Sequence, residues 1–334
     1  MKILVVAPNW IGDALLAQPL LARLRQKHPG ATIDALAPPW TAPVLRRMPD
    51  VAEVIDAPFA HGELKLGERW NLARGLRARA YDEAIVLPNT LKSALIPFFA
   101  GIRVRTGYVG ELRYGLLNRV HGLAKKALPL MAERYAQLAE EPGEPPARPL
   151  AQVGLRVDPA NLAAALERIK LSRSKPVVAF CPGAEYGPAK RWPARYFAEL
   201  ATKLAAQGRS VWLFGSGKDR EIAEEIVRLS GSVAVNLCGK TDLASAIDLL
   251  SLAEVVVSND SGLMHVAAAV GRRVVALYGS SSPEHTPPLS RTYRIVRTGI
   301  DCSPCYAREC PLGHFKCMIE LTPARVLQEI RPVP

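Results

Sequence analysis

VVVSNDSGLMHVAAAVG, residues 255–271, predicts a buried strand followed directly by a helix. Consecutive valines are typical of a strand covered on both faces, and the Ala-rich end is typical of a helix that a glycine terminates. Asp260, Ser261 and Gly262 lie between the two, where ligands bind in open α/β sheets because helix N–H groups point into the crevice. His265 follows one helical turn later and is a candidate for the same pocket. The alternative is an ordinary helix that Asp260 or Ser261 caps.

The alternation of strand and helix continues through the chain. We expect further strands at residues 2–7, 32–37, 51–56, 82–87, 104–109, 177–180, 210–214 and 273–277. Helices are expected from residue 13, at about 68–79, between 90 and 100, at 162–171, 195–206 and 219–229, and near the end from residue 323. Pro19 should bend the first of these helices. This order predicts an α/β protein with parallel sheets covered on both faces.

A proline-rich segment, residues 140–149, interrupts the alternation and predicts a loop or an interdomain linker. Alternation starts again after it, so we expect two α/β domains of similar size that face each other across a cleft. Their expected bounds are residues 1–160 and 161–320, with a terminal helix in residues 321–334.

Composition limits the partners that the protein can have. The 334 residues are 49% hydrophobic and carry a formal net charge of +12, which favours an anionic partner. Nucleic acid is the weakest candidate, because the basic residues are scattered and match no common binding motif. An acidic membrane surface and a phosphorylated small molecule fit better. The chain shows neither a secretory signal nor a membrane-spanning run, and its six cysteines then favour the reducing cytoplasm.

Asp13 is the first candidate for chemistry. It follows a predicted strand and the turn Asn9-Trp10-Ile11-Gly12, and it begins a helix, so its carboxylate should point into the crevice. The turn has one glycine where a dinucleotide fingerprint needs three, and an acid stands where pyrophosphate would lie. A general base suits this position better than a phosphate neighbour does. The alternative is that Asp13 caps the helix.

A second candidate site is the loop CPGAEYGPAKRWP, residues 181–193, between a strand and a helix. Its glycines permit a ligand to approach the backbone, and the adjacent cations Lys190 and Arg191 can neutralise a diphosphate. It lacks the ending of a P-loop, which argues against nucleotide hydrolysis. The alternative is a solvated surface loop. Gly215, in the turn FGSGKD, is a weaker candidate that can pass beside a ribose or a base.

Four cysteines cluster near the end of the chain. Cys302, Cys305, Cys310 and Cys317 have the spacing C-x2-C-x4-C-x6-C. Zinc ligands, reduced packing thiols and disulfide-forming pairs all remain open, because the second pair lacks the C-x2-C spacing of common zinc sites. We expect any such site to be structural and to lie apart from the crevice loops.

The chain resembles the ADP-heptose:lipopolysaccharide heptosyltransferases, glycosyltransferase family 9, over nearly its full length. The resemblance is carried by the motifs at residues 9–13, 183–192, 259–265 and 278–288 and by the cysteine-rich segment after them. Within the family it is strongest for the branch that transfers heptose to heptosyl-Kdo2-lipid A. The resemblance implies the GT-B architecture, two Rossmann-like doubly wound domains, with the terminal helix crossing back to the first.

The resemblance also implies roles for the candidate residues. ADP-L-glycero-β-D-manno-heptose would bind the second domain, with Lys190 and Arg191 on its diphosphate, and Asp13 would deprotonate the acceptor in an inverting displacement. Metal and cofactor are not required if protein cations and dipoles carry the leaving-group charge. The full set of implied donor-binding residues is Gly183, Ala184, Glu185, Tyr186, Lys190, Arg191, Gly215, Asp260, Ser261, Gly262 and His265.

The acceptor would bind the first domain. Asn89, Lys92 and Ser93 follow a predicted strand there and should face the crevice. A string of cations is opposed locally only by Glu111 and could meet acceptor carboxylates, phosphates or the anionic inner leaflet. Its members are Arg103, Arg105, Arg113, Arg119, Lys125 and Lys126.

Other functions remain open on the sequence. Heptosyltransferases that act at another core position, numbered I and III, would use the same donor loops. Sugar-nucleotide epimerases share the two-domain architecture and need no lipid acceptor. A zinc-bearing nucleic-acid binder would account for the charge and the cysteines, but it would leave Asp13 and Lys190 without a role.

Overall fold

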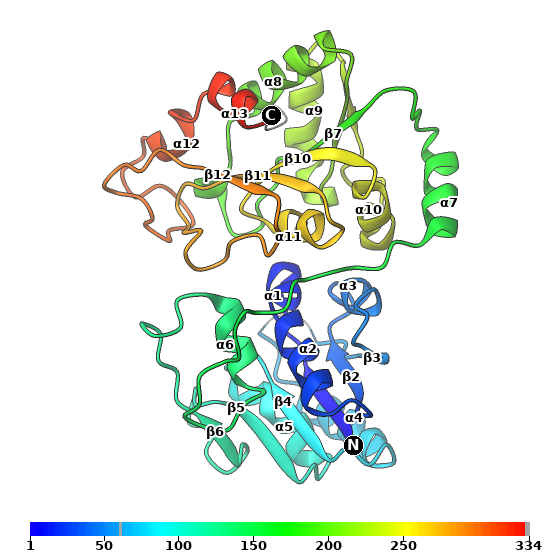
Figure 1. Cartoon of the computed structure of the whole chain (residues 1–334), viewed down its shortest axis with the longest axis vertical. Coiled ribbons are helices and arrows are strands. Elements are labelled where there is room, and N and C mark those ends of the chain that lie inside the picture. The colour runs from blue at the N-terminus through cyan, green and yellow to red at the C-terminus, as the bar shows by residue number, and fades with distance from the viewer. Residues whose placement is uncertain (60–61, 331–334) are drawn as a thin grey trace. The chain divides into compact units, whose positions relative to one another are not determined.

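A computed structural model describes residues 1–59 and 62–330 of the chain (Figure 1). The chain divides into two compact units, Met1–Leu155 and Arg156–Pro334. This division lies close to the boundary that we expected after residue 160. The proline-rich residues 140–149 form a loop near the end of unit 1, as the sequence predicts.

Unit 1 contains a sheet of six parallel strands in the order β3-β2-β1-β4-β5-β6. The strands are β1 (Lys2–Val6), β2 (Thr32–Ala37), β3 (Glu53–Asp56), β4 (Glu83–Val86), β5 (Val104–Tyr108) and β6 (Arg119–His121). β1 and β4 lie side by side in the middle, with Val6 opposite Val86. This is the strand order of a doubly wound fold, in which the chain leaves the two central strands in opposite directions.

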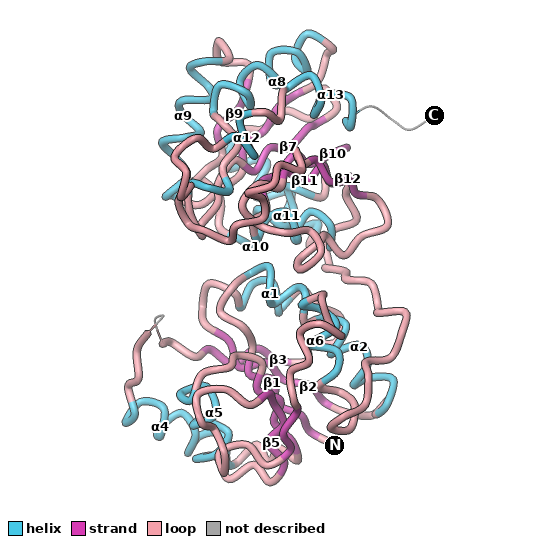
Figure 2. The backbone as a smooth tube through the Cα atoms, turned by 90° about the vertical axis from the view of Figure 1, so that its left-hand side faces the viewer, coloured by secondary structure: helices cyan, strands magenta, loops and turns pink. Residues whose placement is uncertain are grey.

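Helices cover both faces of this sheet, so its strands are mostly apolar and buried. Figure 2 shows α4 and α5 on one side of the strands and α2 and α6 on the other. The first helical segment breaks at Ala17, and Pro19 lies in the first turn of α2, which agrees with the bend expected there. The helices are α1 (Ile11–Leu16), α2 (Gln18–Lys27), α3 (Ala42–Arg46), α4 (Leu66–Arg77), α5 (Leu91–Phe99) and α6 (Met131–Gln137).

Unit 2 repeats this topology with the order β12-β11-β10-β7-β8-β9, again entirely parallel. Its strands are β7 (Val177–Cys181), β8 (Ser210–Leu213), β9 (Ala234–Asn236), β10 (Ala253–Asn259), β11 (Arg273–Leu277) and β12 (Tyr293–Val296). Its helices are α7 (Pro159–Ile169), α8 (Ala194–Ala206), α9 (Arg220–Leu229), α10 (Leu243–Leu250), α11 (Gly262–Ala269), α12 (Lys316–Ile319) and α13 (Pro323–Ile330). The quoted stretch thus forms β10, the central strand beside β7, and α11, as the sequence predicts.

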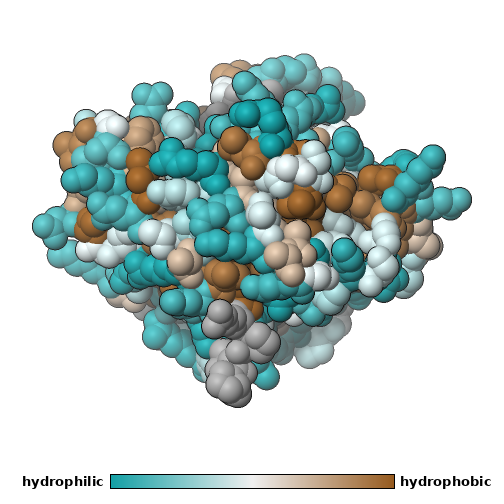
Figure 3. Space-filling model, turned by 90° about the horizontal axis from the view of Figure 1, so that it is seen from above, coloured by the Kyte–Doolittle hydropathy of each residue, from teal (hydrophilic) through white to brown (hydrophobic). Residues whose placement is uncertain are grey.

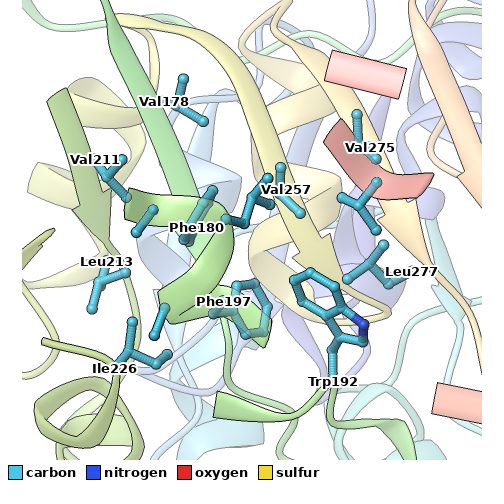
Figure 4. Packing of buried hydrophobic residues seen from close by; sticks show 14 of the residues in the cluster. Val178, Phe180, Trp192, Phe197, Val211, Leu213, Ile226, Val257, Val275 and Leu277 are labelled. Carbon is cyan, nitrogen blue, oxygen red and sulfur yellow. The ribbon is translucent and has the colours of Figure 1, made fainter. Parts of the chain in front are cut away.

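The core of unit 2 extends from the sheet to the loops that follow it (Figure 4). Phe180 of β7 contacts Phe197 of α8 with ring centres 5.4 Å apart. Trp192 stands edge-on to Phe197 at 4.8 Å and is fully buried. Its indole N–H donates to the carbonyl of Leu321 at 2.6 Å. Trp192 therefore anchors in the core one end of the loop that carries Lys190.

The terminal helix α13 packs on α8 and β11 of unit 2, and the Arg273 guanidinium donates to the Glu329 carbonyl at 2.8 Å. Residues 331–334, the end of the expected crossing segment, lie outside the described residues, and the crossing back to the first domain stays a prediction. No helix within the described residues has the length and apolar character needed to span a bilayer. On the face drawn in Figure 3, hydrophilic side chains separate the apolar ones.

Candidate active site

The candidate residues of each unit gather at its topological switch point, the crevice between the two central strands. In unit 1 the loop after β1 leads into α1 with Asp13, and the loop after β4 carries Asn89. In unit 2 the loop after β7 carries Lys190, and the loop after β10 carries Asp260. Ligands of doubly wound sheets bind at these crevices, because two loops diverge there and helix N-termini face them.

The crevice of unit 1 holds a pocket of about 240 Å³. Among the described residues, the pocket is lined by one carboxylate, that of Asp13, by one cation, Arg134, and otherwise by uncharged side chains. The pocket is lined by Pro8, Asn9, Trp10, Asp13, Leu87, Pro88, Asn89, Tyr108, Leu123, Met131, Arg134 and Tyr135. Aromatic faces and a few hydrogen-bonding groups around a small cavity suit a sugar ring.

Asp13 is the third residue of α1, and the residue at the N-cap position is Trp10. The structure therefore favours the pocket-facing interpretation of Asp13 over the alternative that it is the N-cap. Burial, and then the negative charge of Asp13, raise the pKa of the Tyr135 hydroxyl well above its usual value. Tyr135 thus stays a neutral hydroxyl beside the carboxylate.

Arg113 is 1% exposed and organises the loop that carries Asn89. Its guanidinium donates to the carbonyl of Pro88 at 2.7 Å and to Asn89 Oδ1 at 3.2 Å. Because Oδ1 accepts this bond, the Nδ2 group remains as the donor that Asn89 offers to the pocket. Burial lowers the pKa of Arg113. The structure thus places Arg113 beneath the pocket, where it positions Asn89, and a direct contact with an acceptor stays a prediction.

The other predicted acceptor residues are not all gathered in this pocket. Lys92 and Ser93 line a second cavity of about 60 Å³ in the same unit. Arg105 stacks over Phe98 and donates to the carbonyl of Leu116 at 2.6 Å, and Arg103 is exposed. Contact of these residues with an acceptor stays a prediction.

The expected string of unopposed cations is interrupted by ion pairs. Arg119 contacts Glu83 at 3.3 Å and Glu141 at 2.6 Å, so this member of the string is opposed by acids from elsewhere in the chain as well as by the local Glu111. Both acids are distant in sequence, which is why the local pattern did not reveal them. Lys125 and Lys126 remain exposed on the loop after β6.

In unit 2 the loop at residues 182–192, called here the basic loop, is held at both ends by one side chain. Asn259, the last residue of β10, is fully buried. Its Nδ2 donates to the Pro182 carbonyl at 2.7 Å, and its Oδ1 accepts from the Trp192 N–H at 3.1 Å. Asn259 was not among the predicted site residues, although its position just before Asp260 was a usable signal.

Lys190 reaches Asp260 across the crevice between β7 and β10. The Nζ–Oδ2 distance is 2.6 Å, and the side chains are 18% and 6% exposed. His265 on α11 is buried behind them. Burial lowers its pKa to about 4, and this shift is reduced by the negative charge of Asp260 and increased by the positive charge of Lys190. His265 is therefore neutral at pH 7 and does not add a positive charge to the pair.

The remaining predicted donor residues surround this pair. Ser261 is the N-cap of α11, and Gly262 is the first residue of that helix. Arg191 donates to the Ala184 carbonyl at 3.4 Å, and Glu185 pairs with Lys218. Gly183 and Gly215 both lie against Asp219, where a Cβ at either position would collide with that side chain. The structure thus brings the predicted donor residues together on the two central loops and their neighbour after β8.

The cysteine segment, residues 300–317, contacts the basic loop, so the expectation that it lies apart from the crevice loops is wrong. The Tyr186 hydroxyl donates to the Tyr306 carbonyl at 2.8 Å, and the Ala189 N–H donates to the Arg308 carbonyl at 3.0 Å. A Cβ at Gly187 would collide with that same carbonyl. All six cysteines are free, and no cluster of three or more metal-ligating side chains occurs within residues 1–59 and 62–330.

Two doubly wound parallel-strand units, each with its polar loops at the switch point, form the architecture of GT-B glycosyltransferases. The model of glycosyltransferase family 9 (heptosyltransferase) matches residues 69–316. The chain belongs to this family and is an enzyme of the heptosyltransferase type, which confirms the fold and the resemblance that the motifs indicated.

Individual relatives match nearly the whole chain. Lipopolysaccharide heptosyltransferase 2 of Escherichia coli K12 is 46% identical over 99% of this chain and 97% of its own length. Lipooligosaccharide heptosyltransferase 2 of Haemophilus influenzae is 44% identical over 99% and 98%. The solved structure of the E. coli ADP-heptose lps heptosyltransferase II superimposes with a TM-score of 0.89 at 45% identity, covering 99% of this chain and 97% of that one.

Proposed function

We propose that the protein is a heptosyltransferase II, which moves L-glycero-D-manno-heptose from ADP-heptose to heptosyl-Kdo2-lipid A during synthesis of the lipopolysaccharide inner core. The observation that carries the proposal is the pairing of two switch-point sites in one chain. One is the Asp13 pocket of unit 1, and the other is the Lys190–Asp260 pair of unit 2. The shared name of its near full-length relatives supports the choice of acceptor.

The donor binds to unit 2 in this proposal. Lys190 and Arg191 attract the diphosphate, and the N–H groups at the start of α11, near Ser261 and Gly262, add hydrogen bonds to it. The charge that develops on the departing ADP is stabilised by these fixed groups. Neutral His265 contributes a hydrogen bond without adding charge.

The acceptor heptose binds in the Asp13 pocket. Asp13 takes the proton from the attacking hydroxyl while that oxygen forms a bond to the anomeric carbon and the bond from this carbon to the diphosphate oxygen breaks. Attack from the face opposite the leaving group inverts the anomeric centre through an oxocarbenium-like transition state. Asn89, held by Arg113, orients an acceptor oxygen through its Nδ2 group. The enzyme works in the cytoplasm, and its net charge of +12 favours peripheral contact with the anionic inner leaflet.

The test measures ADP release from ADP-heptose with heptosyl-Kdo2-lipid A, with Kdo2-lipid A, and without acceptor. We expect release only with the heptosylated acceptor. Use of Kdo2-lipid A alone would instead identify a heptosyltransferase I, and conversion of ADP-heptose without acceptor would support an epimerase.

Asp13→Asn tests the proposed base in the same assay. It should lower kcat by about 10²–10⁴-fold, the usual cost of losing a general base, and leave ADP binding unchanged. Normal turnover by this variant would show that Asp13 is not the base.

A further inference from the structure

Arg308 of the cysteine segment is a cation near the basic loop that has no role in the function proposed above. Its guanidinium carbon lies 5.2 Å from the centre of the Tyr186 ring, and Lys190 Nζ lies 5.1 Å from the same centre. Arg308 is exposed, and no carboxylate pairs with its guanidinium within the residues that the structure describes. One aromatic ring thus has two cations beside it.

The two cations differ in how their charge is balanced. Lys190 is bonded to Asp260 at 2.6 Å, which compensates its charge before any ligand arrives. Lys218, another cation near the loop, is similarly paired with Glu185. A diphosphate carries more negative charge than Arg191 and one compensated lysine can neutralise together. The site as described therefore needs further uncompensated cations, and Arg308 offers a planar fork suited to phosphate oxygens.

The position of Arg308 is fixed by its backbone rather than by its side chain. Its carbonyl accepts the Ala189 N–H at 3.0 Å, and the Tyr186 hydroxyl donates to the Tyr306 carbonyl at 2.8 Å. The segment is itself held to the loop after β11, because the Tyr306 N–H donates to the Ser280 carbonyl at 2.6 Å. Gly187 permits this approach, since a Cβ there would meet the Arg308 carbonyl. The ordered backbone thus places the Arg308 guanidinium beside the basic loop and its Tyr186 ring.

We propose that Arg308 is a donor-binding residue that contacts the terminal phosphate of the nucleoside diphosphate, stacked beside Tyr186 and acting together with Lys190. The proposal rests on the function proposed above, because it assumes that the basic loop binds a nucleoside diphosphate. It assigns a binding role to the cysteine segment that its thiols alone did not suggest.

The experiment compares ADP and AMP binding to the full chain by titration calorimetry. Arg308→Ala should weaken ADP binding about tenfold, the loss expected for a charge-assisted hydrogen bond, and should change AMP binding little. Arg308→Lys should recover part of the ADP affinity, since it keeps the charge but loses the planar fork. The matched control is Arg291→Ala, an exposed arginine just before the start of the edge strand β12, whereas the basic loop follows the end of the central strand β7.

The outcomes separate this proposal from the proposed function. If Arg308→Ala binds ADP as the wild type does, or weakens ADP and AMP equally, the phosphate contact is refuted and the proposed function stands. If the wild-type chain binds no ADP, both are refuted. In the transfer assay, Arg308→Ala should raise KM for ADP-heptose and leave KM for the acceptor unchanged, whereas a folding defect would lower the active fraction and leave both values unaltered.

Discussion

The ion pair of Lys190 and Asp260 permits a quantitative prediction about the free energy of unfolding. At 2.6 Å, and with an effective dielectric constant of about 20, the attraction is about 6 kcal/mol, although most of it is offset by the cost of removing the charges from water. Lys190→Met leaves a carboxylate that is only 6% exposed, and should lower the free energy of unfolding by about 3 kcal/mol. Asp260→Asn should cost less, about 1–2 kcal/mol, because the freed lysine can reach water.

The double variant decides how much of this cost comes from the pair. With both charges removed, no buried charge is left unpaired, so the double variant should lose about 2 kcal/mol less than the sum of the two single variants. Urea unfolding followed by tryptophan emission suits this measurement. The two buried tryptophans, Trp192 and Trp212, both lie in unit 2, whereas Trp10, Trp40 and Trp70 in unit 1 are more than 40% exposed. The emission shift on unfolding therefore reports mainly on the unit that contains the pair.

Additive effects of the two substitutions would refute this reasoning. Additivity would mean that each side chain affects stability independently of the other, so that the two charges have no coupling energy despite their short distance. The control is Lys203→Met with its partner Glu199, an exposed pair at 2.6 Å for which the coupling should not exceed about 0.5 kcal/mol.

Three further predictions concern the surroundings of the sites. Gly187→Ala should raise the Kd for ADP, because the added Cβ displaces the basic loop from the cysteine segment, whereas Gly217→Ala meets no atom within 4 Å and should leave it unchanged. Trp192→Phe should lower the free energy of unfolding by about 1–3 kcal/mol, since a buried carbonyl loses its indole donor, as urea titration can show. Burial lowers the pKa of His121 to about 4, below its unfolded value of about 6.5, so stability is retained above pH 6.5 and falls as the pH drops toward 4. His121→Phe should flatten that fall by up to about 1.4 kcal/mol per pH unit, and an unchanged profile would contradict the buried neutral state.

The sequence predicted the strands well where they are central and apolar. β1, β7, β10 and β11 are buried nearly throughout, and their runs of valine, isoleucine and leucine are recognisable without any tertiary information. Several elements were missed, among them the short edge strands β6, β9 and β12 and the helices α3, α6, α10 and α12. Strands of three or four residues are formed by pairing with a neighbour that the local sequence does not specify.

The sequence selected some of the candidate site residues and not others. Asp13, Lys190 and Asp260 follow central strands, and the strand pattern together with the composition of the loops selected them as candidates. Asn259 and Arg308 were not selected, because the contacts that bring them to the basic loop join segments distant in sequence. Arg113 was selected for its charge, but its burial beneath Asn89 depends on how the loop after β5 folds back, which periodicity does not report.

The anchoring of the basic loop by the cysteine segment has a consequence for synthesis on the ribosome. β7 and the loop after it emerge early, but the partners of that loop arrive later, first Asn259 and Asp260 and finally Tyr306 and Arg308. A nascent chain that has released only the first part of unit 2 holds Lys190 on a loop without its supports. We expect such a chain to hold the nucleotide poorly until translation is almost complete, so that chains cut short before residue 300 do not compete with the finished enzyme for its donor.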